Sequence, residues 1–156
     1  MELFLVQHGL AKPEDEDPER SLTEEGAEAV WRMAAWATRI RLSVDQIRHS
    51  GKRRAEQTAE IFAERVGPVN GVVAIPGLQP NDDVHLMAEA LQAEEGSLML
   101  VGHLPFLSHL VSLLLAGNPQ KQVVQFQNAG IVSLSRREGD WSINWAVTPD
   151  LVDSAG

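Results

Sequence analysis

The sequence of 156 residues contains no cysteine. Disulfide bonds, thiolate zinc sites and cysteine nucleophiles are therefore excluded, and a reducing compartment such as the cytosol is favoured. No apolar run is long enough to span a membrane, and the first residues lack the basic segment that is typical of a signal peptide. We expect a cytoplasmic protein without a membrane partner.

Positive charge is scarce in this chain. The 13 Lys and Arg residues stand against 22 Asp and Glu residues, which gives a net charge of −9 with histidine neutral. We therefore expect no nucleic acid among the partners, because a polyanion would be repelled. The positive charge that exists is concentrated in residues 32–65, with 8 basic and 4 acidic side chains. This basic island is suited to a small anion, although a solvated helix face explains it equally well.

Length and composition predict one folded domain. The chain is far shorter than the roughly 250 residues at which folded chains usually divide. Its 44% hydrophobic and 22% charged residues are typical of a globular protein. We therefore expect residues 1–156 to form a single domain.

Short apolar runs alternate along the chain with longer segments of helical periodicity. Strands are predicted at residues 3–6, 44–48, 72–75 and 98–101, and helices at about 23–40, 52–66, 84–91 and 105–116. Residues 131–135 and 141–147 then form an alternating pair around a turn, which is typical of a hairpin. This order predicts an α/β fold with a mostly parallel sheet, helices on both faces and a C-terminal hairpin.

The first predicted helix should bury a broad apolar face. Its stripe consists of Ala27, Val30, Trp31, Ala34 and Ile40, widened by Met33 and Trp36. We expect both tryptophans to lie in the core.

Imidazole and guanidinium side chains follow several of the predicted strands. The residues after the strands are Gln7-His8-Gly9, then His49-Ser50-Gly51-Lys52-Arg53-Arg54, then Gly102-His103. Ligand crevices of open α/β sheets lie at the carboxyl ends of the strands, so these groups should converge. Arg54 and His103 are each expected at the start of a helix, where free N–H groups favour an anion. The combination suits a phosphoryl group.

Four motifs in this order resemble those of the histidine phosphatase superfamily. They are His8-Gly9 after the first strand, Leu-Thr-x-x-Gly at Leu22 to Gly26, Ser-x-x-x-Arg-Ala-Glu-Gln-Thr at Ser50 to Thr58, and Gly-His-Leu-Pro at Gly102 to Pro105. The chain resembles most closely the small SixA-type phosphohistidine phosphatases, over nearly its whole length. This resemblance implies a phosphoglycerate-mutase-like fold and a hydrolase that needs no metal or other cofactor.

The resemblance also implies a covalent mechanism. His8 would attack phosphorus, and water would release inorganic phosphate from the phosphohistidine intermediate. A neutral imidazole, with an ordinary pKa of about 6.5, is nucleophilic at neutral pH without a metal. The implied substrate is a phosphohistidine-containing protein of a phosphorelay. The phosphate-binding residues implied in the same way are Gln7, Gly9, Arg54, His103 and Leu104, with His8, His103 and Arg54 as the catalytic set.

One position departs from the superfamily motif, which has arginine before the nucleophilic histidine where this chain has Gln7. A charge-assisted hydrogen bond is worth about 1.5–3 kcal/mol, against roughly 1 for a neutral one. A deficit of about 1–2 kcal/mol corresponds to a rate roughly 5–30-fold lower. Lys52, Arg53 and Arg20 are candidates to compensate, although each is also explained as an exposed charge.

Three alternatives remain open at the level of sequence. Asp83 or its neighbour Asp82 is a candidate general acid, although both are better explained as N-caps of the following helix. A non-catalytic module of the same fold would bind phosphate or a phosphoprotein without turnover. A metal hydrolase would use His8, His49 and His103 as zinc ligands.

Overall fold

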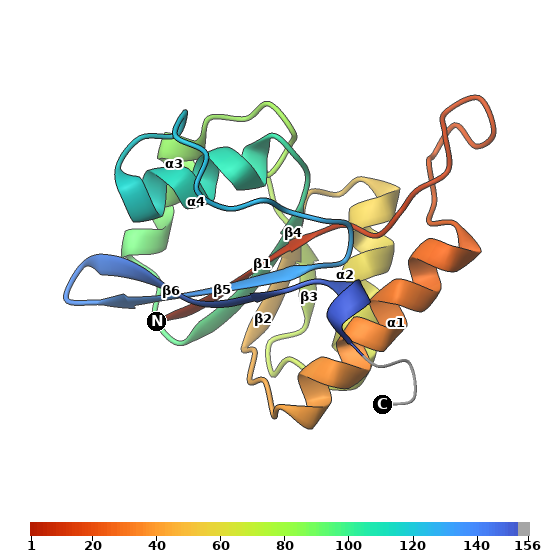
Figure 1. The fold of residues 1–156 in the computed structure, drawn as a ribbon, viewed down its shortest axis with the longest axis horizontal. Helices are drawn as coiled ribbons and strands as arrows, with labels where there is room; N and C mark the ends of the chain where they lie inside the picture. Colours follow the sequence, from red (N-terminus) through yellow and green to blue (C-terminus); the bar gives the residue numbers. More distant parts are fainter. Residues whose placement is uncertain (153–156) are drawn as a thin grey trace.

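Six strands form one mixed sheet in the computed structural model, which describes residues 1–152 (Figure 1). The strands are β1 (Glu2–Gln7), β2 (Gln46–His49), β3 (Val72–Ala74), β4 (Ser97–Gly102), β5 (Ile131–Arg137) and β6 (Asp140–Val147). Their order across the sheet is β3-β2-β4-β1-β5-β6. The first four strands run parallel, whereas β5 is antiparallel to β1 and pairs with β6 as a hairpin.

Helices cover both faces of this sheet. They are α1 (Glu24–Arg39), α2 (Arg53–Val66), α3 (Val84–Gln92) and α4 (Phe106–Ala116), and a short helix η1 (Pro149–Leu151) follows β6. α1 and α2 lie on one face, and α3 and α4 lie on the other (Figure 1). The predicted α/β fold class is therefore confirmed. The predicted domain of residues 1–156 includes residues 153–156, which lie outside the described residues, and the domain count stays a prediction.

The central strand β1 shows why the core has two halves. Phe4 and Val6 point into the cluster formed with α1 and α2, whereas Leu3 and Leu5 point into the cluster formed with α3 and α4. All four side chains are buried, because successive residues of a strand face opposite sides of the sheet and both sides are covered. Within the described residues, no helix has the length and apolar character needed to cross a membrane.

The buried face of α1 differs in part from the prediction. Trp31 is 37% exposed and Ile40 is 43% exposed, so the prediction that they lie in the core is wrong. Ile40 follows the last helical residue, and Trp31 lies at the edge of a narrower stripe. Trp36 does pack against the core, edge-to-face with Trp145 at 5.3 Å between ring centroids. The buried residues of α1 are Gly26, Val30, Met33, Ala34 and Ala37.

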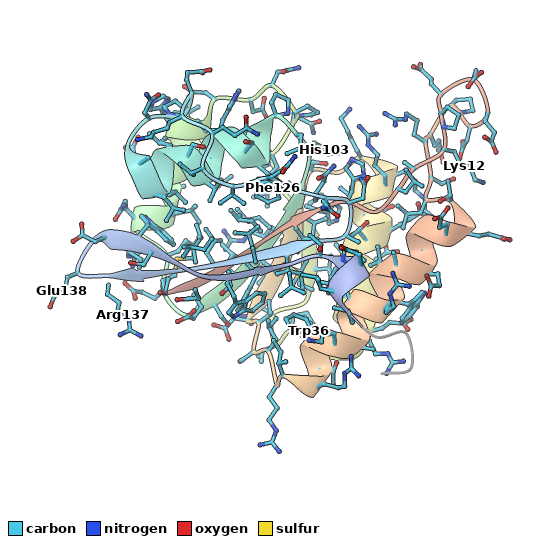
Figure 2. The ribbon with its side chains drawn as sticks, viewed as in Figure 1. Lys12, Trp36, His103, Phe126, Arg137 and Glu138 are labelled. Atoms are coloured by element: carbon cyan, nitrogen blue, oxygen red, sulfur yellow. The ribbon has the colours of Figure 1, made fainter. Side chains whose placement is uncertain are left out.

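The carboxyl ends of β1, β2 and β4 lie at one edge of the sheet. Gln7 at the end of β1 is opposite Gly102 at the end of β4, and His49 at the end of β2 is opposite Val101. The loop of residues 10–23 projects beside this edge, where Figure 2 labels Lys12 (Figures 1 and 2). The tip of the β5–β6 hairpin, labelled at Arg137 and Glu138, lies on the other side of the molecule (Figure 2).

Candidate active site

Two histidine rings lie next to each other at this edge. His8 directly follows β1, His103 directly follows β4, and their ring centroids are 5.0 Å apart. The backbone N–H of His8 donates to the carbonyl of Gly102 at 3.1 Å, which ties the two strand ends together. The sequence predicted that these two histidines converge, because each follows a parallel strand, and the structure brings them together.

The ring of His8 is prepared as a nucleophile. Its Nδ1 lies 2.7 Å from the carbonyl oxygen of Gly9, so Nδ1 carries the proton and Nε2 keeps its lone pair. The pKa of His8 is lowered from 6.5 to about 4, chiefly by burial. The hydrogen bond to Gly9 opposes this shift, and the positive charges of Arg54 and Arg20 add to it. The imidazole is therefore neutral at neutral pH.

The ring of His103 is held by Ser50 through one nitrogen, and its other nitrogen has no partner among the described residues. Its Nε2 lies 2.6 Å from the hydroxyl oxygen of Ser50, which also accepts the backbone N–H of Lys52 at 3.3 Å. A neutral His103 whose Nε2 accepts the Ser50 hydroxyl hydrogen carries its ring proton on Nδ1. Nδ1 is buried and has no partner among the described residues. Burial, followed by the charges of nearby His8 and Arg54, lowers the pKa of His103 to about 3.

Arg54 provides a second unpartnered donor. It lies in the first turn of α2, and its Nε is buried without a partner among residues 1–152. Burial and repulsion by Arg20 lower its pKa, but an arginine remains charged at neutral pH. Buried donors are rarely left unpaired in a folded protein. Arg54 Nε and His103 Nδ1 are two such atoms, and a bound oxyanion would give each of them a partner.

The motif from Ser50 to Thr58 holds the site together through three hydrogen bonds to different loops. Ser50 positions His103, as described above. The side chain of Gln57 accepts the backbone N–H of Leu22 at 2.8 Å. The hydroxyl of Thr58 accepts the N–H of Gly9 at 3.0 Å and donates to the carbonyl of Arg54 at 2.8 Å. The beginning of α2 thus fixes the loops that carry both histidines.

The Leu-Thr-x-x-Gly motif fixes the loop after His8 from the other side. The hydroxyl of Thr23 caps α1 by accepting the N–H of Gly26 at 2.8 Å, and the N–H of Thr23 donates to the carbonyl of Leu10 at 3.0 Å. A Cβ atom at Gly26 would collide with that same carbonyl. Glycine is therefore required here by the close approach of two backbone segments.

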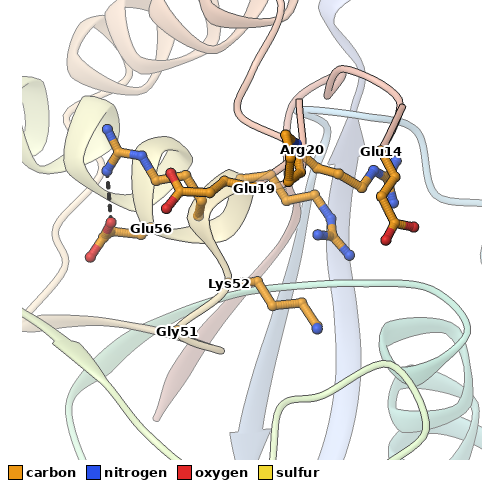
Figure 3. Close-up of a pocket in the computed structure, with 9 residues that line it drawn as sticks. Glu14, Glu19, Arg20, Gly51, Lys52 and Glu56 are labelled. Atoms are coloured by element: carbon orange, nitrogen blue, oxygen red, sulfur yellow. Dashed lines mark hydrogen bonds and ion pairs between the residues drawn. The ribbon is translucent and has the colours of Figure 1, made fainter. Parts of the chain in front are cut away.

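An open cavity of about 550 Å³ lies beside Arg54 (Figure 3). Four basic side chains line it, and one of them, Arg53, forms an ion pair with Glu56 at 2.7 Å. The lining residues are Glu14, Pro18, Glu19, Arg20, Gly51, Lys52, Arg53, Arg54 and Glu56. Three residues of the basic island, Lys52, Arg53 and Arg54, therefore line this cavity.

Comparison with known proteins agrees with this arrangement. No family model matches the chain. The phosphohistidine phosphatase SixA of Escherichia coli (strain K12) is 30% identical over 155 residues, which cover 96% of this chain and 94% of that protein. The chain belongs to the SixA family of histidine phosphatases.

Solved structures support the same relationship. A structure of the protein histidine phosphatase SixA complexed with tungstate superposes on this SixA-family chain with a TM-score of 0.87 and 29% identity, covering 97% of this chain and 99% of the other. A phosphoserine phosphatase from Entamoeba histolytica, in complex with 3-phosphoglyceric acid, has a TM-score of 0.72 at 18% identity and covers 93% and 95% of the two chains. The second likeness concerns the fold alone.

Three of the residues expected to bind phosphate have different surroundings in this SixA-family chain. Gly9 uses its N–H for Thr58 and its carbonyl for His8, so it positions the nucleophile and has no free donor for phosphate. Leu104 is 40% exposed and lines a separate cavity of about 530 Å³ with Gln7. The side-chain oxygen of Gln7 is buried without a partner among the described residues.

Asn128 is a residue of the site that the sequence analysis missed. Its side-chain amide donates to the carbonyl of His8 at 2.9 Å, and the next residue, Ala129, donates its N–H to the carbonyl of Gln7 at 2.9 Å. These bonds join segments 120 residues apart. No local pattern in the sequence signals such a contact.

The candidate general acids have structural partners. Asp83 caps α3 and accepts the N–H of His85 at 2.9 Å, as its explanation as an N-cap predicted. Asp82 accepts the N–H of Gln79 at 2.8 Å, within the preceding loop instead of at the helix. The bonds from His85 lower the pKa of Asp83, which favours its ionised form.

The three histidines of the metal-hydrolase alternative do not form a set of ligands. Nδ1 of His49 accepts the N–H of Gly51 at 3.0 Å. Within the part of the chain that the structure describes, no three His, Asp or Glu side chains are arranged to hold a metal ion.

Proposed function

We propose that this protein removes the phosphoryl group from phosphohistidine on a partner protein, through a covalent phosphohistidine formed on His8. The observation that carries this proposal is the orientation of the His8 ring, with Nδ1 held 2.7 Å from the Gly9 carbonyl. That hydrogen bond fixes the tautomer with a lone pair on Nε2. The similarity to the SixA phosphatase of Escherichia coli supports the same substrate class.

In the first step, the lone pair of His8 Nε2 forms a bond to phosphorus while the bond from phosphorus to the partner's imidazole nitrogen breaks. The partner's imidazole leaves as the neutral ring, with its proton supplied from solvent. Arg54 Nε and His103 Nδ1 donate to the equatorial oxygens. Such stabilisation supplies most of the catalysis in phosphoryl transfer, because charge spreads over these oxygens in the transition state.

In the second step, water attacks the phosphorus on His8, and the N–P bond breaks. Inorganic phosphate leaves, and His8 regains its lone pair. The low pKa of His8, about 4, keeps the ring unprotonated between turnovers. An imidazole departs readily, so the reaction does not require the carboxylic acid that an ester would need. The capping role of Asp83 is consistent with this chemistry.

Gln7 makes a non-catalytic binding module the second candidate, because it lacks the charge of the arginine in the family motif. The test compares the wild-type protein, His8→Ala and Gln7→Arg on a phosphohistidine-containing protein and on a simple phosphate ester. We expect no turnover by His8→Ala, and a gain of about 5–30-fold in Gln7→Arg. The ester should be hydrolysed poorly by all three proteins.

The possible outcomes separate the two candidates. If the wild-type protein retains the phosphohistidine protein but never dephosphorylates it, the binding module is correct and the enzyme proposal is wrong. If His8→Ala turns over as fast as the wild type, the proposed nucleophile is wrong.

A further inference from the structure

Arg20 is a loop cation that lines the cavity beside Arg54. It belongs to the loop of residues 10–23, far from α2 in the sequence, yet it lines the same cavity as Lys52, Arg53 and Arg54. Figure 3 shows the side chains of Arg20 and Lys52 together in this cavity. Arg20 is one of the three cations that the sequence offers to compensate for Gln7, and the structure distinguishes it from Lys52 and Arg53.

The loop is built to hold Arg20 in one place. Lys12 donates its N–H to the carbonyl of Ser21 at 2.9 Å, and Arg20 Nε donates to the carbonyl of Lys12 at 3.1 Å. The side chain of Asp17 accepts the backbone N–H and the hydroxyl of Ser21. Arg20 itself has a φ of 52°, a left-handed conformation that is uncommon for a residue other than glycine. Such conformations persist where surrounding contacts impose them, and they are found preferentially at functional sites.

The cations of the cavity differ in how they are paired. Arg53 is bound to Glu56, whereas no ion pair among residues 1–152 involves Arg20, Lys52 or Arg54. Glu14 and Glu19 also line the cavity, but they form no ion pair with Arg20 within the described chain. Unpaired like charges that line one cavity repel each other, and a bound anion would relieve that repulsion.

The cations also differ in which groups of the site their charges act on. The charge of Arg20 lowers the pKa of His8, of His103 and of Arg54. Lys52 has this effect on His103 alone among the three. Arg20 is therefore the loop cation whose field reaches both rings and the guanidinium of Arg54.

We propose that Arg20 is the second guanidinium of the phosphate site and supplies the charge that Gln7 lacks. The inference rests on the proposed function, and it identifies Arg20 as a residue that contacts the phosphoryl oxygens of the substrate. The main competitor, Arg32, lines the other cavity together with Gln7, but it is bound to Glu28 at 3.1 Å. Arg20 has no such partner.

The test is a double-mutant cycle between positions 7 and 20. Arg20→Gln, made in the wild type, should lower kcat/KM for a phosphohistidine protein about ten- to hundredfold, the range expected for one charge-assisted hydrogen bond. In the Gln7→Arg background, the same substitution should cost about threefold or less, because the new arginine supplies the charge. kcat should fall along with kcat/KM, because the contact is with the reacting group.

Two control variants make the result specific. Arg53→Gln removes a charge from the same cavity and should change kcat/KM by about twofold or less, because Arg53 is already paired with Glu56. Arg20→Lys keeps the charge without the planar fork and should retain more activity than Arg20→Gln. Urea unfolding of each variant verifies that the fold is intact; residue 20 lies in a loop, so we expect no change in the midpoint.

Tungstate affinity gives a readout that is independent of turnover. We expect Arg20→Gln to weaken tungstate binding by a similar factor, and Arg53→Gln to leave it unchanged. If tungstate affinity depends on Arg20 while the wild-type protein never hydrolyses phosphohistidine, the Arg20 assignment stands and the proposed function is wrong.

Three results would overturn the inference. The first is a kcat/KM and tungstate affinity of Arg20→Gln that match those of Arg53→Gln. The second is an equal loss on Arg20→Gln in both backgrounds, because Arg20 would then act independently of Gln7. The third is a loss of kcat/KM on Lys52→Gln that is large in the wild type and small in the Gln7→Arg background, while Arg20→Gln shows no such difference.

Discussion

Replacing Thr58 by valine removes one hydrogen-bond acceptor from the centre of the site while keeping the shape of the side chain. Thr58 is fully buried, and its hydroxyl accepts the N–H of Gly9 at 3.0 Å. In Thr58→Val that buried N–H has no partner, and the expected loss in the free energy of unfolding is about 1–3 kcal/mol. Gly9 in turn holds Nδ1 of His8, so a shift of this loop should also lower kcat, about ten- to hundredfold.

The chain offers a matched control for this substitution. Thr38 lies on α1, is exposed, and its hydroxyl lies within donating distance of the carbonyls of Ala34 at 3.1 Å and Arg65 at 3.2 Å, as Thr58 donates to the carbonyl of Arg54 at 2.8 Å. Thr38→Val should change the free energy of unfolding by about 0.5 kcal/mol or less. Urea unfolding and steady-state turnover measure both variants. Equal unfolding midpoints for the two variants, with full activity in Thr58→Val, would refute this account of the Thr58 hydrogen bond.

Four further predictions concern the loop, the nucleophile and metal dependence. Gly26→Ala should lower the free energy of unfolding by about 1–3 kcal/mol, because its Cβ meets the Leu10 carbonyl; an unchanged urea midpoint would contradict this close approach. NMR should show the His8 ring in the free protein titrating near pH 4, and a midpoint at 6.5 would contradict its burial. Because this pKa is below that of the unfolded chain, the contribution of His8 to stability should decline as pH falls from 6.5 towards 4. Turnover should be the same with and without a strong chelator, whereas a loss restored by zinc would favour the metal-hydrolase alternative.

The order of elements was predictable because periodicity is a local property. The helix beginning after Thr23 and the hairpin of β5 and β6 both follow from the spacing of apolar residues and from turn or capping residues. The meeting of His8 with His103 was also predictable, because the ends of parallel strands share one edge of the sheet. Each of these inferences needs only neighbours in the sequence or a general rule of sheet geometry.

The supporting contacts of the site were not predictable in the same way. The bond from Asn128 to the His8 carbonyl depends on how β5 is placed next to β1. The reach of Arg20 depends on the conformation of a loop that has no periodicity. Trp31 was expected in the core because its hydrophobicity fits a broad helical stripe, but the surface on which α1 packs is narrower than the stripe. Contacts of this kind are set by tertiary geometry.

The central claim is that the phosphoryl group is transferred to His8 as a covalent intermediate. The most direct test incubates the protein with a radiolabelled phosphohistidine protein, stops the reaction at alkaline pH during the first turnover, and locates the label by peptide mass spectrometry. The account predicts label on His8 of the wild-type phosphatase and no label on the His8→Ala phosphatase. Label on His103, or rapid release of phosphate with His8 never labelled, would contradict it.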